Sequence, residues 1–126
     1  MRHFWCGILT LILLLGICLL ITGEIVRIHR PVAGFLEQAA IAGAKEEWPA
    51  ARELVSKADK LWRYGHAFTA AVADHTPMDE IDSLFRRLPV LAAAEETVEF
   101  TAACRALAQK TEAMVQAHSW AWENLL

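Results

Sequence analysis

The stretch ARELVSKADKLWRYGHAFTAAV, residues 51–72, decides the fold of this chain. Its apolar and small residues recur at steps of three and four, the spacing that puts side chains on one face of an α-helix. That face comprises Ala51, Leu54, Ala58, Leu61, Gly65, Phe68 and Val72, with Val55, Trp62 and Thr69 along one edge. The pattern predicts a helix that buries this face against at least one other helix.

A second helix is predicted to begin within the turn segment ADHTPMDEID, residues 73–82. Thr76 is expected to cap it, Pro77 suits its first position, and Asp79 completes a variant of the capping box. The helix should bury Ile81 and end before Pro89, after about three turns.

The third long helix is expected to begin near Ala94, with Glu95 and Glu96 in its first turn, and to continue to the chain end. Its stripe follows four-three spacing through Phe100, Cys104, Leu107, Thr111, Met114, His118, Ala121 and Leu125, and Trp122 borders it. Similar lengths favour an antiparallel pair with the 51–72 helix, and the shorter helix should complete a small bundle. The predicted core contains Leu54, Leu61, Phe68, Ile81, Leu107, Met114, Trp122 and Leu125.

The beginning of the chain differs from the rest. The run FWCGILTLILLLGICLLI, Phe4 to Ile21, contains eighteen residues without a charge and is long enough to cross a bilayer. Because it exceeds the apolar region of a cleaved signal peptide and no A-x-A site follows, we expect an uncleaved, single-pass anchor in the cell membrane. The short tail before it favours a signal anchor, with the region after it outside the cytoplasm.

The fold class predicted is therefore all-α, with an N-terminal transmembrane helix followed by a small antiparallel helical bundle. Residues 1–23 form the tail and anchor. Residues 24–46 form a membrane-proximal helix, broken or kinked at Pro31, and a linker. Residues 47–126 form the bundle.

The composition excludes several functions. All 15 acidic residues follow the anchor, and the basic residues are dispersed, so nucleic-acid binding is not expected. The five histidines form no helical i, i+4 pair, and neither a zinc motif nor a phosphate loop occurs. Cys104 sits on an apolar stripe without a base. We therefore expect no metal, no cofactor and no catalytic site.

The chain end, HSWAWENLL, contains two tryptophans that cannot share a helix face, since residues two apart point about 200° from each other. Trp122 belongs with the core, which leaves Trp120. It is a rim residue, a membrane-interface anchor or a partner contact, and it is the candidate partner-contact residue because tryptophan is enriched at binding hot spots.

The layout resembles a known family. An N-terminal anchor, a helix with Trp62, then His75 with Asp79, Glu80 and Ile81, and a last helix ending in Glu123, Asn124, Leu125 and Leu126 are similar to the domain-of-unknown-function family numbered four-three-six-three. The resemblance implies a small, helical, bacterial membrane protein and supplies no activity.

Two functions remain open. The first is a non-enzymatic interaction or scaffold module at the membrane, whose partners are the lipid bilayer and another membrane or envelope protein. The alternative is a ligand-sensing bundle at the membrane surface. A module should expose an interaction surface, whereas a sensor should enclose a cavity of about 300 Å³ or more with a few convergent polar groups.

Overall fold

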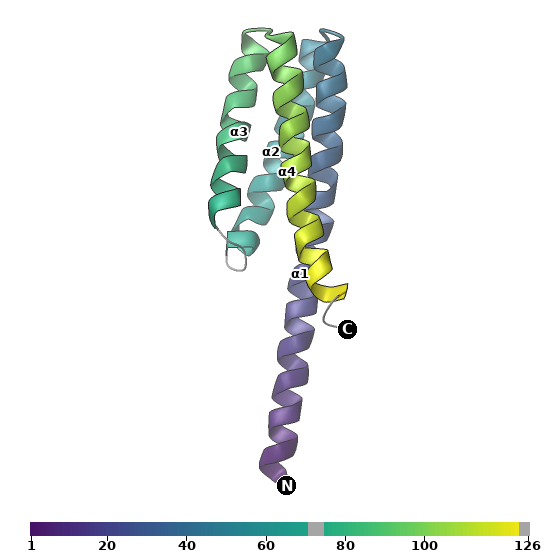
Figure 1. The fold of residues 1–126 in the computed structure, drawn as a ribbon, viewed down its shortest axis with the longest axis vertical. Helices are drawn as coiled ribbons and strands as arrows, with labels where there is room; N and C mark the ends of the chain where they lie inside the picture. Colours follow the sequence, from purple (N-terminus) through teal and green to yellow (C-terminus); the bar gives the residue numbers. More distant parts are fainter. Residues whose placement is uncertain (71–74, 124–126) are drawn as a thin grey trace.

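A computed structural model describes residues 1–70 and 75–123 of the chain, with side chains described for residues 1–67 and 77–117. The described residues form four helices, α1 (Arg2–Ala44), α2 (Trp48–Ala70), α3 (His75–Ala93) and α4 (Thr97–Glu123). The predicted all-α class is confirmed. Figure 1 shows an up-down-up-down bundle that includes only the second half of α1, while the first half extends alone beyond the bundle.

Helix α1 has two different halves. Up to Leu20, its large apolar side chains are exposed, and its most apolar 18-residue window has no buried residue. From Ile25 onward, one face is buried in the bundle through Ile28, Val32, Leu36 and Ala39. One helix is thus long and apolar enough to span a membrane, and it also supplies a quarter of the bundle.

The break expected at Pro31 is absent, because α1 continues through this residue to Ala44. A proline inside a helix removes one hydrogen bond and crowds the preceding turn. The buried residues on both sides of Pro31 hold the helix together across it. Residues 24–44, predicted as a membrane-proximal helix leading to a linker, therefore belong to the bundle.

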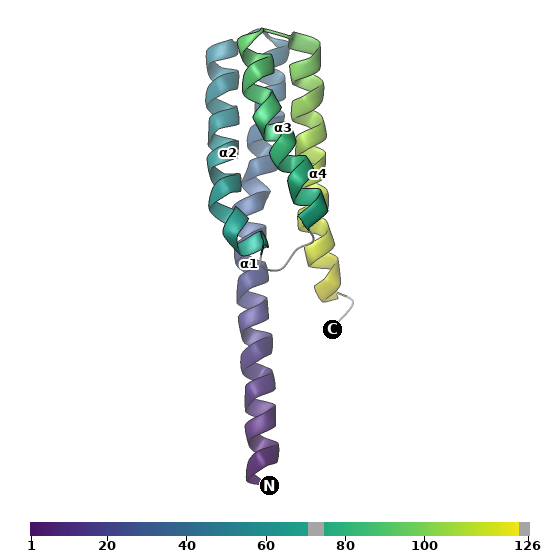
Figure 2. The same cartoon turned by 90° about the vertical axis from the view of Figure 1, so that its left-hand side faces the viewer.

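The predicted antiparallel pairing of the second and last long helices is wrong. Helix α1 packs along both α2 and α4, and these two run in the same direction at opposite corners of the bundle (Figure 2). Small residues on α1 allow both helices to approach closely. These residues, all buried, are Ala39, Ala40, Ala42 and Gly43.

The buried face of α2 is close to the predicted one. Ala51, Ala58 and Gly65 are buried as expected, but Leu54 and Leu61 are only half-buried. Val55 and Trp62, which were predicted at the edge of the apolar face of α2, lie at the centre of its buried face, since Trp62 is 1% exposed and Val55 is 4% exposed. Among the other predicted core residues, Ile81, Leu107 and Met114 are buried.

Two helix ends differ from their predictions. Helix α3 continues through Pro89 to Ala93, and α4 begins at Thr97 rather than near Ala94. Glu95 and Glu96 therefore lie in the turn. Leu91 and Ala92, both buried, extend the contact surface of α3 beyond its proline.

The two turns at the end of the bundle far from the N-terminus have the same geometry. Glu46 adopts φ 61° and Glu95 adopts φ 54°, and these are the positive-φ residues of the described chain outside glycine. In the first turn, Glu46 N donates to Gly43 O and Glu47 N donates to Ala42 O. In the second turn, Glu95 N donates to Ala92 O and Glu96 N donates to Leu91 O. Each residue of the second turn lies 49 positions after its equivalent in the first (46 to 95). Both are Schellman motifs that close a helix C-terminus.

The same offset relates the buried residues of the two halves. Eight pairs of residues that lie 49 positions apart, one in each hairpin, are buried at both positions. These pairs are Val32/Ile81, Leu36/Phe85, Ala39/Leu88, Ala42/Leu91, Ala51/Phe100, Val55/Cys104, Ala58/Leu107 and Trp62/Thr111. The bundle is thus two equivalent helical hairpins, related by a pseudo-twofold axis along its length. The symmetry is hidden in the sequence because the buried residues differ in type in every pair.

Candidate functional site

The carboxylate of Asp82 on α3 contacts two polar side chains of α2. Trp62 Nε1 donates a hydrogen bond to Asp82 Oδ1 at 2.6 Å, and His66 Nε2 lies 3.2 Å from Asp82 Oδ2. Trp62 and His66 are one turn apart on α2, so one carboxylate joins two side chains of the facing helix. This contact fixes the register between α2 and α3.

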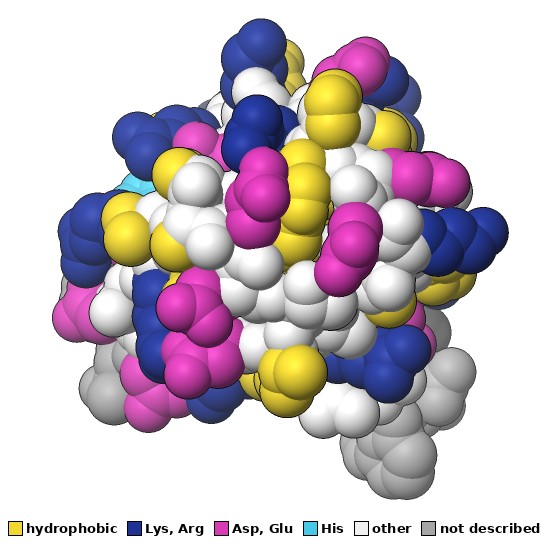
Figure 3. All heavy atoms as spheres, turned by 90° about the horizontal axis from the view of Figure 1, so that it is seen from above, with side chains coloured by type: hydrophobic (Ala, Val, Ile, Leu, Met, Phe, Trp, Pro, Cys, Tyr) yellow, Lys and Arg dark blue, Asp and Glu magenta, His cyan; other side chains and the backbone are white. Residues whose placement is uncertain are grey.

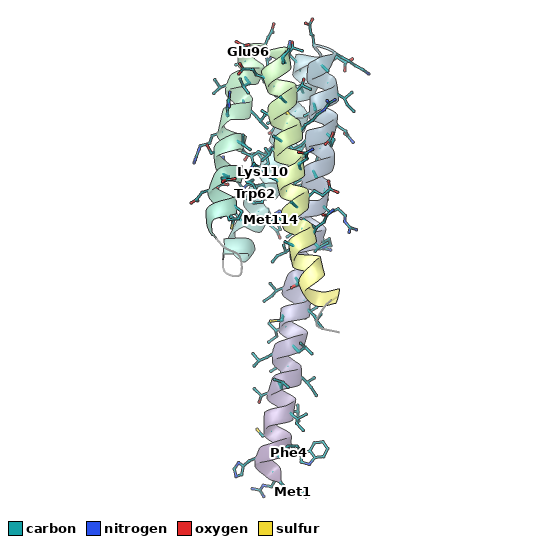
Figure 4. All side chains as sticks on the ribbon, in the orientation of Figure 1. Met1, Phe4, Trp62, Glu96, Lys110 and Met114 are labelled. Atoms are coloured by element: carbon teal, nitrogen blue, oxygen red, sulfur yellow. The ribbon has the colours of Figure 1, made fainter. Side chains whose placement is uncertain are left out.

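Aromatic rings surround this contact. The Trp62 indole packs against His29 of α1 at 4.9 Å between ring centroids, and stacks on Phe85 of α3 at 6.1 Å. His66 approaches its edge at 6.2 Å. Figure 4 shows Trp62 inside the bundle, at a height close to that of Lys110. Trp62 therefore ties α1, α2 and α3 together, and an apolar shell strengthens its bond to Asp82.

A hollow of about 510 Å³ opens beside this contact, between α2 and α3. It is open to solvent on one side. Five of its seven lining residues are polar or charged, and the full lining comprises Asp59, Arg63, His66, Ala67, Asp82, Phe85 and Arg86. The Arg63 guanidinium is held by Asp59, with Nε 3.0 Å from each carboxylate oxygen.

A second hollow, of about 320 Å³, lies between α1 and α4. Its lining comprises His29, Arg30, Ala33, Gly34, Glu37, Glu112, Val115 and Gln116. Five of these residues occupy positions equivalent to residues of the α2/α3 hollow under the 49-residue offset. The two hollows are therefore pseudo-symmetric counterparts.

The counterparts differ in chemistry. The equivalent positions hold different residue types in the two hollows. The pairs, with the α1/α4 residue first, are Glu37 and Arg86, Glu112 and Arg63, Ala33 and Asp82, and Val115 and His66. Each hollow is therefore lined by two carboxylates, and in the α2/α3 hollow one of them, Asp82, contacts an imidazole. The α2/α3 hollow has two guanidinium groups, whereas the α1/α4 hollow has one, Arg30. Helices α1 and α4 also pack more extensively than α2 and α3 do.

The α2/α3 hollow continues toward the turns as a third, more apolar depression of about 340 Å³. Asp59 and Phe85 line both. The remaining lining is Arg52, Val55, Ser56, Pro89, Ala92 and Ala93. An open groove with an apolar floor and charged margins thus follows α2 and α3, and we take it as the candidate functional site.

Sequence reasoning did not find this site. It assigned Asp79 to the cap of α3, whereas the carboxylate that α2 contacts is Asp82, one turn later. The i, i+4 spacing of Trp62 and His66 was a usable signal, but their acidic partner depended on how α2 and α3 pack.

Several predicted residues lie outside the described side chains. They are the candidate partner contact Trp120, the cap Thr76, and the core residues Phe68, Trp122 and Leu125. Helix α3 begins at His75, one residue before the predicted cap, and Asp79 is exposed. The backbone of α4 ends beside α1, close to where the exposed half of α1 begins (Figure 1).

Metal and nucleophile chemistry find little support among the described residues. No group of three or more His, Cys, Asp or Glu side chains there could hold a metal ion. Burial, reinforced by the charge of Glu37, raises the pKa of the Cys104 thiol to about 12. A thiol with this pKa is protonated at neutral pH and is a poor nucleophile.

Comparisons with known proteins identify the family of this chain. A search of curated proteins and a search of solved structures found no match. The model of one protein family, described as Domain of unknown function (DUF4363), matches residues 24–125, which cover the bundle and leave out the exposed half of α1. The chain therefore belongs to the DUF4363 family.

Proposed function

We propose that this protein is a single-pass membrane protein that displays a non-enzymatic, four-helix interaction module outside the cytoplasm. One observation carries the proposal, namely the division of α1 into an exposed apolar half and a half buried in the bundle. Exposing some twenty apolar residues to water is unfavourable, whereas a bilayer accommodates them. Because one continuous helix forms both halves, the bundle stands directly on the membrane surface.

The α2/α3 groove is the interaction surface that the geometry favours. It is open, has an apolar floor, and has charged residues along both margins, as protein-binding surfaces do. The end of the bundle that carries the two turns has no comparable surface. Figure 3 shows acidic and basic side chains interspersed there with small apolar patches. The partner expected in this groove is another membrane or envelope protein.

Membrane integration is the first test. Membranes from cells expressing the full-length chain are extracted with alkaline carbonate, and the protein is followed by immunoblot. We expect full-length protein in the pellet. A variant with Leu13→Arg and Leu14→Arg should shift to the supernatant, because two charges near the bilayer centre oppose insertion. Extraction of the wild type, or a shortened product, would contradict the anchor.

The interaction surface is tested with a photo-crosslinking amino acid at Ala67, which lines the α2/α3 hollow. The control position is Gln109, which is exposed on α4 and lines none of the hollows described above. We expect a discrete protein adduct from position 67 in intact cells and none from position 109. Equal adducts at both positions, or none at either, would contradict an interaction site in this groove.

Ligand sensing is the alternative function, favoured by the volume of the α2/α3 hollow and by its convergent Asp82, His66 and Arg63. The open side of the hollow favours a macromolecular partner instead, since small-molecule sites bury most of their ligand. Thermal unfolding with benzoate or inorganic phosphate separates the two functions. The interaction module predicts no shift in Tm at millimolar concentrations, and a saturable rise would favour sensing.

A further inference from the structure

A hollow of about 460 Å³ opens beside α1, close to where this helix leaves the bundle. Its described lining is Gly23, Val26, Arg27, Arg30 and Pro31, and none of these residues is acidic. Gly23, Arg27 and Arg30 are exposed and follow four-three spacing, so they share one face of the helix. A Cβ at Gly23 would meet no atom within 4 Å, so open space lies on this face one turn before the two arginines.

The positive charge of this hollow is only partly neutralised. Glu24, which lies outside the lining, pairs with Arg27 at 3.0 Å between Oε2 and Nη2, and both side chains remain largely exposed. A guanidinium has five N–H donors, so this one contact leaves most of them for another acceptor. Two guanidinium groups and one carboxylate leave one net positive charge at the hollow.

Arg30 also lines the neighbouring α1/α4 hollow, together with Glu37 and Glu112. It forms an ion pair with neither of them, nor with any other described residue. Glu37 lies two turns farther along α1, away from the exposed apolar half. The guanidinium of Arg30 is therefore available to a ligand on the Gly23 side.

The proposed anchor puts this hollow at the membrane surface. The apolar run ends at Ile21, and Arg27 and Arg30 lie about 9 and 14 Å beyond it along the helix, at about 1.5 Å per residue. The polar layer of a bilayer begins there and is about 5–8 Å deep. Side chains on a helix tilt toward its N-terminus, which here is the direction of the membrane. Both long side chains therefore reach back to the layer of lipid phosphates.

Two guanidinium groups on one helix face suit a phosphate group. Arginine binds phosphate oxygens through paired N–H···O hydrogen bonds, which a point charge cannot match. Val26 and Pro31 add apolar surface beside them, and the missing side chain of Gly23 leaves room toward the membrane. A zwitterionic headgroup brings an ammonium group that the arginines repel, whereas an anionic phospholipid does not.

We propose that this hollow binds the phosphate of an anionic phospholipid through Arg27 and Arg30, in the leaflet next to the bundle. The proposal rests on the membrane anchoring proposed above. Because α1 continues from this hollow through the bundle as one helix, a lipid bound here holds the α2/α3 groove at a fixed height above the membrane.

The rest of the chain works against anionic lipid. The 15 acidic side chains all follow the apolar run, and they outnumber the 11 basic ones there, which are the 12 of the chain less Arg2. Retention of an anionic lipid therefore reports a local site rather than a general attraction to the protein.

Native mass spectrometry of the detergent-solubilised full-length chain tests the site. The protein is mixed with phosphatidylglycerol or phosphatidylcholine, and the fraction that retains one lipid is measured. We expect the wild type to retain phosphatidylglycerol at least about fivefold more, and Arg27→Gln with Arg30→Gln to lose this preference. Equal retention of both lipids by the wild type, or an unchanged preference in the double variant, would overturn the proposal.

A matched control removes two guanidinium groups elsewhere. Arg86→Gln with Arg87→Gln makes the same change of charge at exposed positions of α3 that lie farther from the anchored end. This variant should keep the preference, and an equal loss would contradict a local site. Glycerol phosphate in excess should leave the lipid bound. Its displacement of the lipid would assign the hollow to soluble phosphates instead.

Gly23→Leu tests the hollow itself, because it fills open space and keeps both arginines. It should lower phosphatidylglycerol retention by about threefold or more. Gly16→Leu also enters open space, but it lies inside the apolar run and should have no effect. Unchanged retention in Gly23→Leu would show that the lipid does not occupy this hollow.

Alkaline carbonate extraction of membranes that contain the wild-type chain reports the anchor separately. An anchored chain without a lipid preference would overturn the lipid site and leave the membrane module intact. A chain released by carbonate would overturn both, because the hollow would then not lie at a membrane surface.

Discussion

Asp82 shows how one side chain determines the packing of two helices. Its carboxylate is the acceptor for the buried Trp62 indole and contacts His66, so both oxygens face α2. The sequence correctly predicts a helix around each of these residues. It does not predict that the three meet, because spacing along a helix contains no information about the rotation and height of the neighbouring helix.

Replacing Asp82 with alanine is expected to destabilise the bundle by about 1–3 kcal/mol, since the buried Trp62 N–H loses its acceptor. Asp82→Asn, which keeps an oxygen acceptor, should cost clearly less. Urea unfolding of the detergent-solubilised protein, followed by circular dichroism, measures both. Equal stability of wild type and Asp82→Ala would show that this bond does not hold α2 to α3.

Two glycines of α1 should respond in opposite directions to alanine. A Cβ at Gly43 would overlap the ring of Phe100, which is fully buried, so Gly43→Ala should destabilise the protein by about 1–3 kcal/mol. Gly34 has open space, so Gly34→Ala should stabilise by about 0.5–1 kcal/mol through helix propensity. Melting temperatures that move in the same direction would contradict this packing.

Cys104 should contribute to stability in a pH-dependent manner. Burial raises its pKa from 9.0 to about 12, so the unfolded chain loses this proton first and the contribution falls as pH rises from about 9 toward 12. Wild type should exceed Cys104→Ala in unfolding free energy at pH 8, and this difference should shrink by pH 11. A difference that is constant with pH would place the thiol in a polar environment.

At the scale of the helix, the sequence correctly identifies the helical segments and mislocates their ends at prolines. A break or kink was expected at Pro31 and a helix end before Pro89, yet α1 and α3 continue through these residues. A proline penalty of about 3 kcal/mol is local, whereas the buried residues on both sides contribute over several turns. Only the packed structure shows which effect is larger.

The turns offer a test at the same scale. Glu46 has φ 61°, a conformation that disfavours side chains with a Cβ and suits glycine. Glu46→Gly should therefore stabilise the bundle by about 0.5–1 kcal/mol, after allowing for the greater flexibility of glycine in the unfolded chain. Glu47→Gly, one residue later and outside this conformation, is the control and should not stabilise. A fall in melting temperature for Glu46→Gly would contradict the turn geometry.

At the scale of the molecule, the bundle is two similar hairpins whose equivalent hollows are lined by different residues. The long apolar helix at the N-terminus and the all-α class could be predicted, because the length of an apolar run and the period of a stripe are properties of the sequence alone. The pairing of helices could not. Residues 1–23 were predicted as a tail and anchor and residues 24–46 as a membrane-proximal helix and linker outside the bundle, although the alanine-rich second half of α1 is the element on which α2 and α4 both pack.

The hollows also depend on the packing of the whole molecule, because each lies between two different helices. Arg86 and Glu37 look unrelated in the sequence, and they become counterparts once the two turns are known to match. The interaction module that we propose uses both the exposed apolar half of α1 and the α2/α3 groove.

The most direct test of the anchored, outward-facing bundle is labelling of intact cells with a membrane-impermeant maleimide. The chain carries Lys60→Cys, at an exposed position of α2, with Cys6 and Cys18 replaced by alanine and the buried Cys104 retained. The account predicts labelling at position 60 before lysis, and none in a chain that lacks this cysteine. Protection of position 60 until the cells are lysed would contradict it.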